Sequence, residues 1–93
     1  MKISAMTFRL YAPWVHSLKE KRMIVQSLIT RLQNRFHVSA AEIDEQDAHQ
    51  FIQIGAAAIV PHNAMADRLM REITQFIEKS TEAEIIESVL EIR

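Results

Sequence analysis

Three cations and a helix-start signal fall within a run of six residues. Ser17 followed three positions later by Glu20 fits a capping box, in which the serine hydroxyl accepts a backbone N–H, so a helix begins directly after Ser17. Lys19, Lys21 and Arg22 then fall within the first five helical positions. The helix dipole disfavours cations at this end, whereas a helix N-terminus with fixed positive charges suits an anion such as phosphate. The run therefore predicts a phosphate-binding surface.

The same cations have a second interpretation. On a helical wheel Lys21 and Arg22 flank the apolar stripe, so they lean toward the domain instead of pointing into open solvent. Acidic side chains of the domain, Glu42 and Asp47, could then neutralise them and fix the helix against a sheet. Cations that pair with these acidic side chains would have a structural role, because they could contact a phosphate only after their ion pairs were broken. Whether the cations pair with acidic side chains of the domain therefore distinguishes the structural role from phosphate binding.

The composition is that of an ordinary globular protein, with 48% hydrophobic and 25% charged residues among 93. This length predicts a single domain over residues 1–93. The absence of cysteine excludes disulfides, thiolate metal sites and thiol catalysis, and it suits a reducing cytoplasm. The first ten residues lack the apolar core of a signal peptide, and no window is apolar enough to span a membrane. We therefore expect a cytoplasmic protein.

Charge and motifs exclude several functions. A formal net charge of −1 argues against coating nucleic acid through bulk charge, so any RNA contact would be local, and DNA binding is not expected. A single glycine leaves no glycine-rich phosphate loop. The four histidines and the acidic residues within 44–47 do not have a zinc-ligand spacing. We expect no metal, no cofactor and no catalytic residues.

Hydrophobic periodicity divides the chain into six elements. Two segments carry the spacing of an amphipathic helix, and four are alternating or continuously apolar like strands. Pro13 and Pro61 end the first and third strands, and Asn63 is a good N-cap for the second helix. The predicted order is strand 3–10, helix 18–35, strand 38–43, an acidic turn at 44–49, strand 51–60, helix 63–79 and strand 84–92.

This order is typical of the α+β ferredoxin-like plan, βαββαβ, with a four-stranded antiparallel sheet ordered 4-1-3-2 and two helices on one face. The topology brings the start of the first helix and the turn between the second and third strands to one rim. Trp14, His16 and the three cations should therefore lie near Glu42, Asp44, Glu45, Asp47 and His49, and Arg31, Arg35, His37 and His62 should lie at the opposite rim. Phe8 and Phe51 are predicted core residues.

The second face of such a sheet would be open to water in a monomer. The first strand places Ile3 and Ala5 on that face, and the last strand offers it one of two apolar sets. An exposed apolar sheet face usually indicates a partner. We therefore expect a homodimer, with C₂ symmetry, that covers this face.

The residues also resemble a known family. The run His16–Arg22 is followed by Leu28, Leu32, Asn34, Arg35, Phe36, Val38, Ser39, Ala41, Glu42, Gln46, Asp47, Gln50 and Gly55. This pattern resembles the YlxP-like family of small bacterial proteins of unknown function, over nearly the whole chain. The resemblance implies a ferredoxin-like fold and, because the family's genes often sit beside those of translation initiation factor two and ribosome-binding factor A, a role around translation or ribosome maturation.

The resemblance also implies which residues belong to the family's motif. They are His16, Ser17, Lys19, Glu20, Lys21, Arg22, Glu42, Asp47 and Gln50. The chain departs from the family beside Gln50, where His49 and Phe51 stand in place of the usual Trp and Arg. A binding surface built on those family residues would be altered in this chain.

Three functional hypotheses follow. In the first, a non-catalytic cytoplasmic protein uses Lys19, Lys21 and Arg22 to bind phosphate, most plausibly of structured ribosomal RNA, with His16, Ser17, Glu42, Asp47 and Gln50 as the other candidate binding residues. In the alternative, the chain is a protein-interaction or structural homodimer whose basic motif is internally paired. A third, a small-molecule regulatory domain, would need a pocket at a dimer interface.

Overall fold

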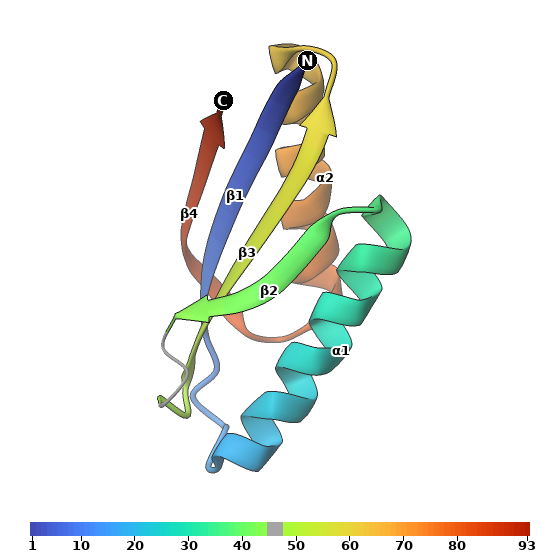
Figure 1. Ribbon diagram of the computed structural model, residues 1–93. Helices are drawn as coiled ribbons and strands as arrows, with labels where there is room; N and C mark the ends of the chain where they lie inside the picture. Colours follow the sequence, from blue (N-terminus) through green and yellow to red (C-terminus); the bar gives the residue numbers. More distant parts are fainter. Residues whose placement is uncertain (45–47) are drawn as a thin grey trace.

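The computed structural model describes residues 1–44 and 48–93, which form four strands and two helices in the predicted order. The elements are β1 (Lys2–Tyr11), α1 (Leu18–Phe36), β2 (Ser39–Asp44), β3 (Phe51–Val60), α2 (Asn63–Ser80) and β4 (Glu84–Ile92). Figure 1 shows the ribbon, with α2 behind the sheet and α1 beside β2. The bounds of β3 and β4 coincide with those expected from the sequence, and the others differ by one residue at one or both ends.

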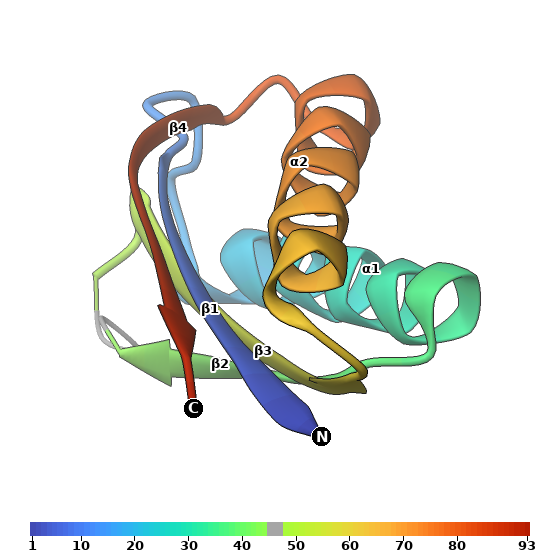
Figure 2. The ribbon, with the colours of Figure 1, turned by 90° about the horizontal axis from the view of Figure 1, so that it is seen from above.

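The four strands form one antiparallel sheet in the order β2-β3-β1-β4. Read from the other edge this is the predicted order 4-1-3-2, so the α+β ferredoxin-like fold is confirmed. Both helices pack on the same side of the sheet, as Figure 2 shows from above. Within the described residues, neither helix is long and apolar enough to cross a membrane.

The hydrophobic core lies between the helices and the sheet. Alternation along β1 sends Met6, Phe8 and Leu10 inward, and each of these side chains is at most 1% exposed. Opposite them, the apolar stripes of α1 and α2 supply the other wall of the core, because residues three and four apart share one helix face. Its fully buried members from the helices and β3 are Leu28, Leu32, Ile52, Ile54, Ile73 and Ile77.

The N-cap of the second helix lies one residue earlier than the sequence indicates. Asn63 was the expected N-cap, but the cap is His62, whose backbone is extended and whose Nδ1 accepts the Met65 N–H at 3.2 Å. The histidine ring substitutes for the oxygen of a usual capping residue. Asn63 is therefore the first helical residue, and the prediction was wrong by one position.

Phe51 is a second departure from expectation. Phe8 is fully buried as predicted, but Phe51 is only half-buried, because its register partner on β1 is Tyr11 on the outward face of the sheet. The two rings stack with centroids 5.2 Å apart, and the Arg9 guanidinium lies 4.7 Å from the Phe51 centroid. Phe51 is thus part of a cross-strand aromatic pair and not a core residue.

Candidate functional site

The start of α1 is fixed by the cap that the sequence predicts. Ser17 has an extended backbone, and its hydroxyl accepts the Glu20 N–H at 3.1 Å. This bond satisfies one of the backbone donors that a helix leaves unpaired in its first turn. The cap sets the rotation of the first turn, and so decides where Lys19, Lys21 and Arg22 point.

Replacing Ser17 with alanine is expected to lower the free energy of unfolding by about 1 kcal/mol, because the Glu20 N–H loses its acceptor. Urea denaturation at a fixed protein concentration measures this change. Ser27→Ala, an exposed change in the interior of α1, is the matched control and should shift stability by less than about 0.5 kcal/mol. Equal effects of the two substitutions would contradict the capping role.

Lys21 is buried in spite of its charge. Its side chain is 2% exposed, and its Nζ donates a hydrogen bond to the Ala48 carbonyl at 2.7 Å and lies 3.1 Å from the Glu42 Oε2. The contact with Glu42 lacks hydrogen-bond geometry, so it is an ion pair rather than a directed bond. Lys21 therefore ties α1 both to β2 and to the segment that precedes β3.

This arrangement follows from the position of Lys21 on the helix. The residue flanks the apolar stripe formed by Val25, Leu28 and Leu32, so its four-carbon stem packs toward the core. A buried ammonium requires both an opposite charge and acceptors. Glu42, on the inward face of β2, supplies the charge and is itself only 19% exposed.

Gln50 is held at the same end of the sheet. Its side-chain amide donates to the Pro13 carbonyl at 3.0 Å, and its own carbonyl accepts the Ala12 N–H at 2.8 Å. Both bonds join the connection that leads into α1 to the residue before β3. Like Lys21, Gln50 stabilises this end of the fold with its side chain.

The remaining candidate residues do not all lie beside Lys21 and Glu42. His16 is exposed in the connection to α1. Asp47, and with it Glu45 and Gln46 of the predicted turn, lie outside the described residues. Of the basic residues predicted at the opposite rim, Arg35 lies over the Phe36 and Phe76 rings. Arg31 does not follow the prediction, because its side chain bonds to the carbonyl of Ser80 at the end of α2 and lines the same groove between α1 and β2 as Lys19 and Arg22. No three described residues of the His, Asp and Glu types come together as metal ligands.

Lys19 and Arg22 differ from Lys21 in that both are exposed. Within residues 1–44 and 48–93, neither side chain has a hydrogen bond or an ion pair. They stand at one end of an open groove of about 1040 Å³ between α1 and β2. Of the three cations, which we call the basic triad, Lys21 is thus paired within the protein, whereas Lys19 and Arg22 face solvent beside the groove.

The groove is apolar along its floor and charged at its rim. Val25 and Ile29 of α1 and Ala40 of β2 are buried or half-buried at its base, and Met23 is 67% exposed on its wall. Twelve residues line it in all: Lys19, Arg22, Met23, Val25, Gln26, Ser27, Ile29, Thr30, Arg31, Ala40, Ala41 and Glu42.

One wall of the groove is the edge of the sheet. In the described part of the chain β2 is an edge strand with β3 as its one neighbour, so its outer backbone groups face the groove. The Ala40 carbonyl shows this direction, because it accepts a hydrogen bond of 3.3 Å from the Gln33 side chain of α1. Backbone groups of an edge strand can pair with a further extended chain.

Sequence reasoning placed the cations but missed the groove. The helical wall of the groove includes Lys19, Met23, Gln26 and Thr30, which recur every three to four residues and therefore share one face of α1, with Arg22 beside them. That periodicity is visible in the sequence. The missing information was that β2, an edge strand, runs along this face.

Two comparisons with known proteins bear on this site. Residues 3–89 match the family described as "Protein of unknown function (DUF503)". The chain is also 37% identical over 68 residues to the "Uncharacterized protein YlxP" of Bacillus subtilis (strain 168), an alignment that covers 73% of this chain and 74% of that protein. The matched segment includes the whole of α1, β2 and β3, and hence the buried Lys21 pair and the groove. The chain therefore belongs to the DUF503 family of YlxP-like proteins of unknown function.

Proposed function

We propose that the protein is a non-catalytic binding protein that takes an extended acidic segment of another protein in the groove between α1 and β2. The observation that carries the proposal is the pairing of two exposed cations, Lys19 and Arg22, with an apolar floor and a sheet edge. The family resemblance suggests a setting in the cytoplasm, around translation or ribosome maturation.

The geometry favours an acidic protein segment over RNA phosphate. Lys21, the third cation of the motif, is buried against Glu42 and Ala48, which leaves two cations for an anionic partner. RNA recognition draws on rows of phosphate contacts and on aromatic faces that stack with bases. Here the Phe51 ring already contacts both the Tyr11 ring and the Arg9 guanidinium, on the face of the sheet that points away from the helices.

An extended partner suits the walls of the groove. A strand laid against β2 would bond to its outward backbone groups and place alternate side chains over the floor. Those side chains would be apolar, to contact Val25 and Ile29, while the others would carry the negative charges that Lys19 and Arg22 attract. Acidic and apolar residues in alternation therefore define the expected ligand.

A fluorescein-labelled octapeptide that alternates Glu and Val tests this proposal by fluorescence anisotropy. The Lys19→Glu/Arg22→Glu variant is expected to bind it at least tenfold more weakly than the wild type, a loss of about 1.4 kcal/mol or more, because two attractions become repulsions. The matched control is Arg71→Glu/Lys79→Glu, which makes the same charge change at exposed positions of α2 away from the groove. It should retain most of the affinity.

Two further probes decide the class of partner. An octapeptide that alternates Lys and Val should bind poorly, because its positive side chains would be repelled by Lys19 and Arg22. A labelled pool of ribosomal RNA fragments should show no binding that depends on Lys19 and Arg22. Salt-dependent RNA binding that disappears in the Lys19→Glu/Arg22→Glu variant would overturn the proposal in favour of phosphate recognition, as would equal binding of the Glu peptide to both double variants.

A further inference from the structure

The face of the sheet that points away from the helices is uncovered. α1 and α2 both lie on the other side (Figure 2). On the uncovered face the register places Ile3 beside Ile59, Ala5 beside Ala57 and Thr7 beside Gly55 on the two central strands. This face adjoins the groove between α1 and β2 along β2, where Ala40 and Ala41 line both hollows, but the helical wall of the groove lies on the other side of the sheet.

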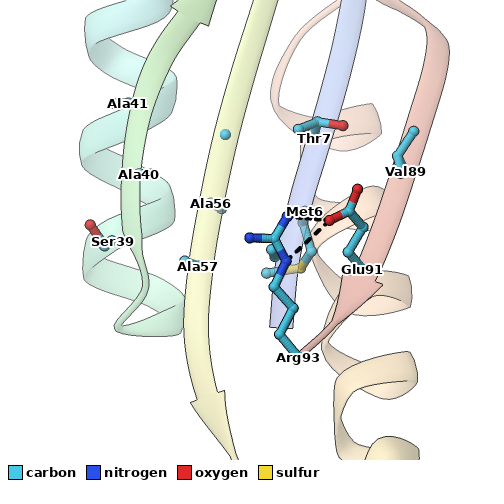
Figure 3. Close-up of a pocket in the computed structure, with 12 residues that line it drawn as sticks. Met6, Thr7, Ser39, Ala40, Ala41, Ala56, Ala57, Val89, Glu91 and Arg93 are labelled. Carbon is cyan, nitrogen blue, oxygen red and sulfur yellow. Dashed lines mark hydrogen bonds and ion pairs between the residues drawn. The ribbon is translucent and has the colours of Figure 1, made fainter. Parts of the chain in front are cut away.

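The centre of this face is a shallow trough of about 370 Å³ with a floor of small side chains. Figure 3 shows Thr7 and Ala57 on the central strands, Ser39 and Ala41 on one side, and Val89 with the Glu91–Arg93 ion pair on the other.

Gly55 helps to keep the trough shallow near β2. A Cβ atom at this position would come within 2.9 Å of Ile43 Cγ2, so the glycine allows the Ile43 side chain to lie across it. Ile43 itself remains 47% exposed.

Large apolar side chains lie at one end and on one side of the trough. Ile3 and Ile59 are neighbours across β1 and β3 at one end and are 43% and 73% exposed, and Val89 on β4 is 40% exposed. Isolated exposed side chains of this kind are common on soluble proteins, but here they share one face with a trough of small residues. A surface that carries both projections and a hollow can be complementary to a copy of itself.

The area and charges of the face also suit a second copy. Four strands about 4.8 Å apart and about 30 Å long present roughly 500–600 Å² in projection, which becomes larger when side-chain relief is included. A standard interface buries about 800 Å² on each partner. Along β1 and β4, Arg9 is the register partner of Glu87 and Arg93 forms an ion pair with Glu91, so these four charges are balanced within each copy.

We infer that two copies of the chain associate through this face, as a C₂ dimer in which Ile3, Ile59 and Val89 of each copy cover the trough of the other. The α1 wall of the groove, with Lys19 and Arg22, stays outside the interface, because α1 lies on the other side of each sheet. Each dimer therefore presents two grooves, and a partner with two acidic segments would bind it with increased avidity.

Sedimentation velocity over a protein concentration range of about 5–500 μM tests the inference. The wild type is expected to move from the 10.8 kDa monomer toward twice that mass. Ile59→Glu should raise the dimer dissociation constant at least 100-fold, since each interface contains the substitution twice. Met23→Glu makes the same change at another highly exposed apolar position, on α1, and should leave the dimer intact.

The side chain of Ile59 is already largely exposed in the single chain, so Ile59→Glu should fold, and Val89→Glu supplies a second interface variant if it does not. A wild type that stays monomeric at 500 μM would overturn the inference without reference to any variant. So would a dimer that survives both Ile59→Glu and Val89→Glu, or one that dissociates in Lys19→Glu/Arg22→Glu and hence uses the groove.

Discussion

Replacing Lys21 with alanine is expected to lower the free energy of unfolding by about 2–4 kcal/mol. The substitution leaves the Glu42 carboxylate without its ion-pair partner and the Ala48 carbonyl without its donor, and it removes a buried aliphatic stem. Breaking a fully buried pair from one side typically costs about 3–5 kcal/mol. The expected loss is smaller because Glu42 keeps 19% of its side chain exposed and can turn toward water.

Two further variants show whether the buried ion pair is the cause of this loss of stability. The free energy of unfolding is measured by urea denaturation at a fixed protein concentration. Lys19→Ala removes a neighbouring but exposed cation and should change stability by less than about 0.5 kcal/mol. Lys21→Met with Glu42→Gln removes both charges while keeping the volume of the stem, and should recover part of the loss. If Lys21→Ala proved as harmless as Lys19→Ala, Lys21 would not be the structural member of the triad.

Replacing Phe8 with alanine should lower the free energy of unfolding by about 3–5 kcal/mol. The ring is fully buried between the sheet and the helices, so its removal combines lost burial with a cavity that its neighbours cannot close. The same urea measurement quantifies the loss.

Phe51→Ala is the matched comparison, because it removes the same atoms from the open face. It should cost about 1–1.5 kcal/mol, the contribution of a half-buried ring stacked on Tyr11. Similar losses at the two positions would contradict the assignment of Phe8 to the core and of Phe51 to the open face.

The architecture could be predicted from local patterns. Alternation along β1, the helical stripe from Val25 to Leu32 and the prolines after β1 and β3 each determine a local element, and few topologies join six such elements in this order. The capping hydroxyl of Ser17 could be predicted for the same reason, since its partner is only three residues away.

Features that depend on distant contacts could not be read in the same way. The sequence allowed either that Lys21 faces a ligand or that it pairs with Glu42, and only the packing of α1 against β2 selects the second. Phe51 lies in a nearly continuous apolar run, so periodicity did not reveal which face it occupies. At the start of α2, histidine is an uncommon cap, and the usual preference for asparagine favoured the wrong residue by one position.

The run from Ser17 to Arg22 thus has a structural role and a proposed binding role within one turn of helix. Ser17 caps the turn, and Lys21 ties it to β2 and to the residue before His49. With the turn held in this way, Lys19 and Arg22 are presented at the end of the groove between α1 and β2. The structural cation thus positions the two that we propose bind a partner.

The most direct test of this account is an ¹⁵N–¹H spectrum of the labelled protein titrated with the Glu–Val octapeptide. We predict that the amide signals that shift belong to the groove, namely to residues 19–30 of α1 and residues 40–43 of β2, and that those of β4 and of the exposed side of α2 stay unchanged. Shifts centred on the open sheet face around Ile59, or no shifts at millimolar peptide, would contradict it.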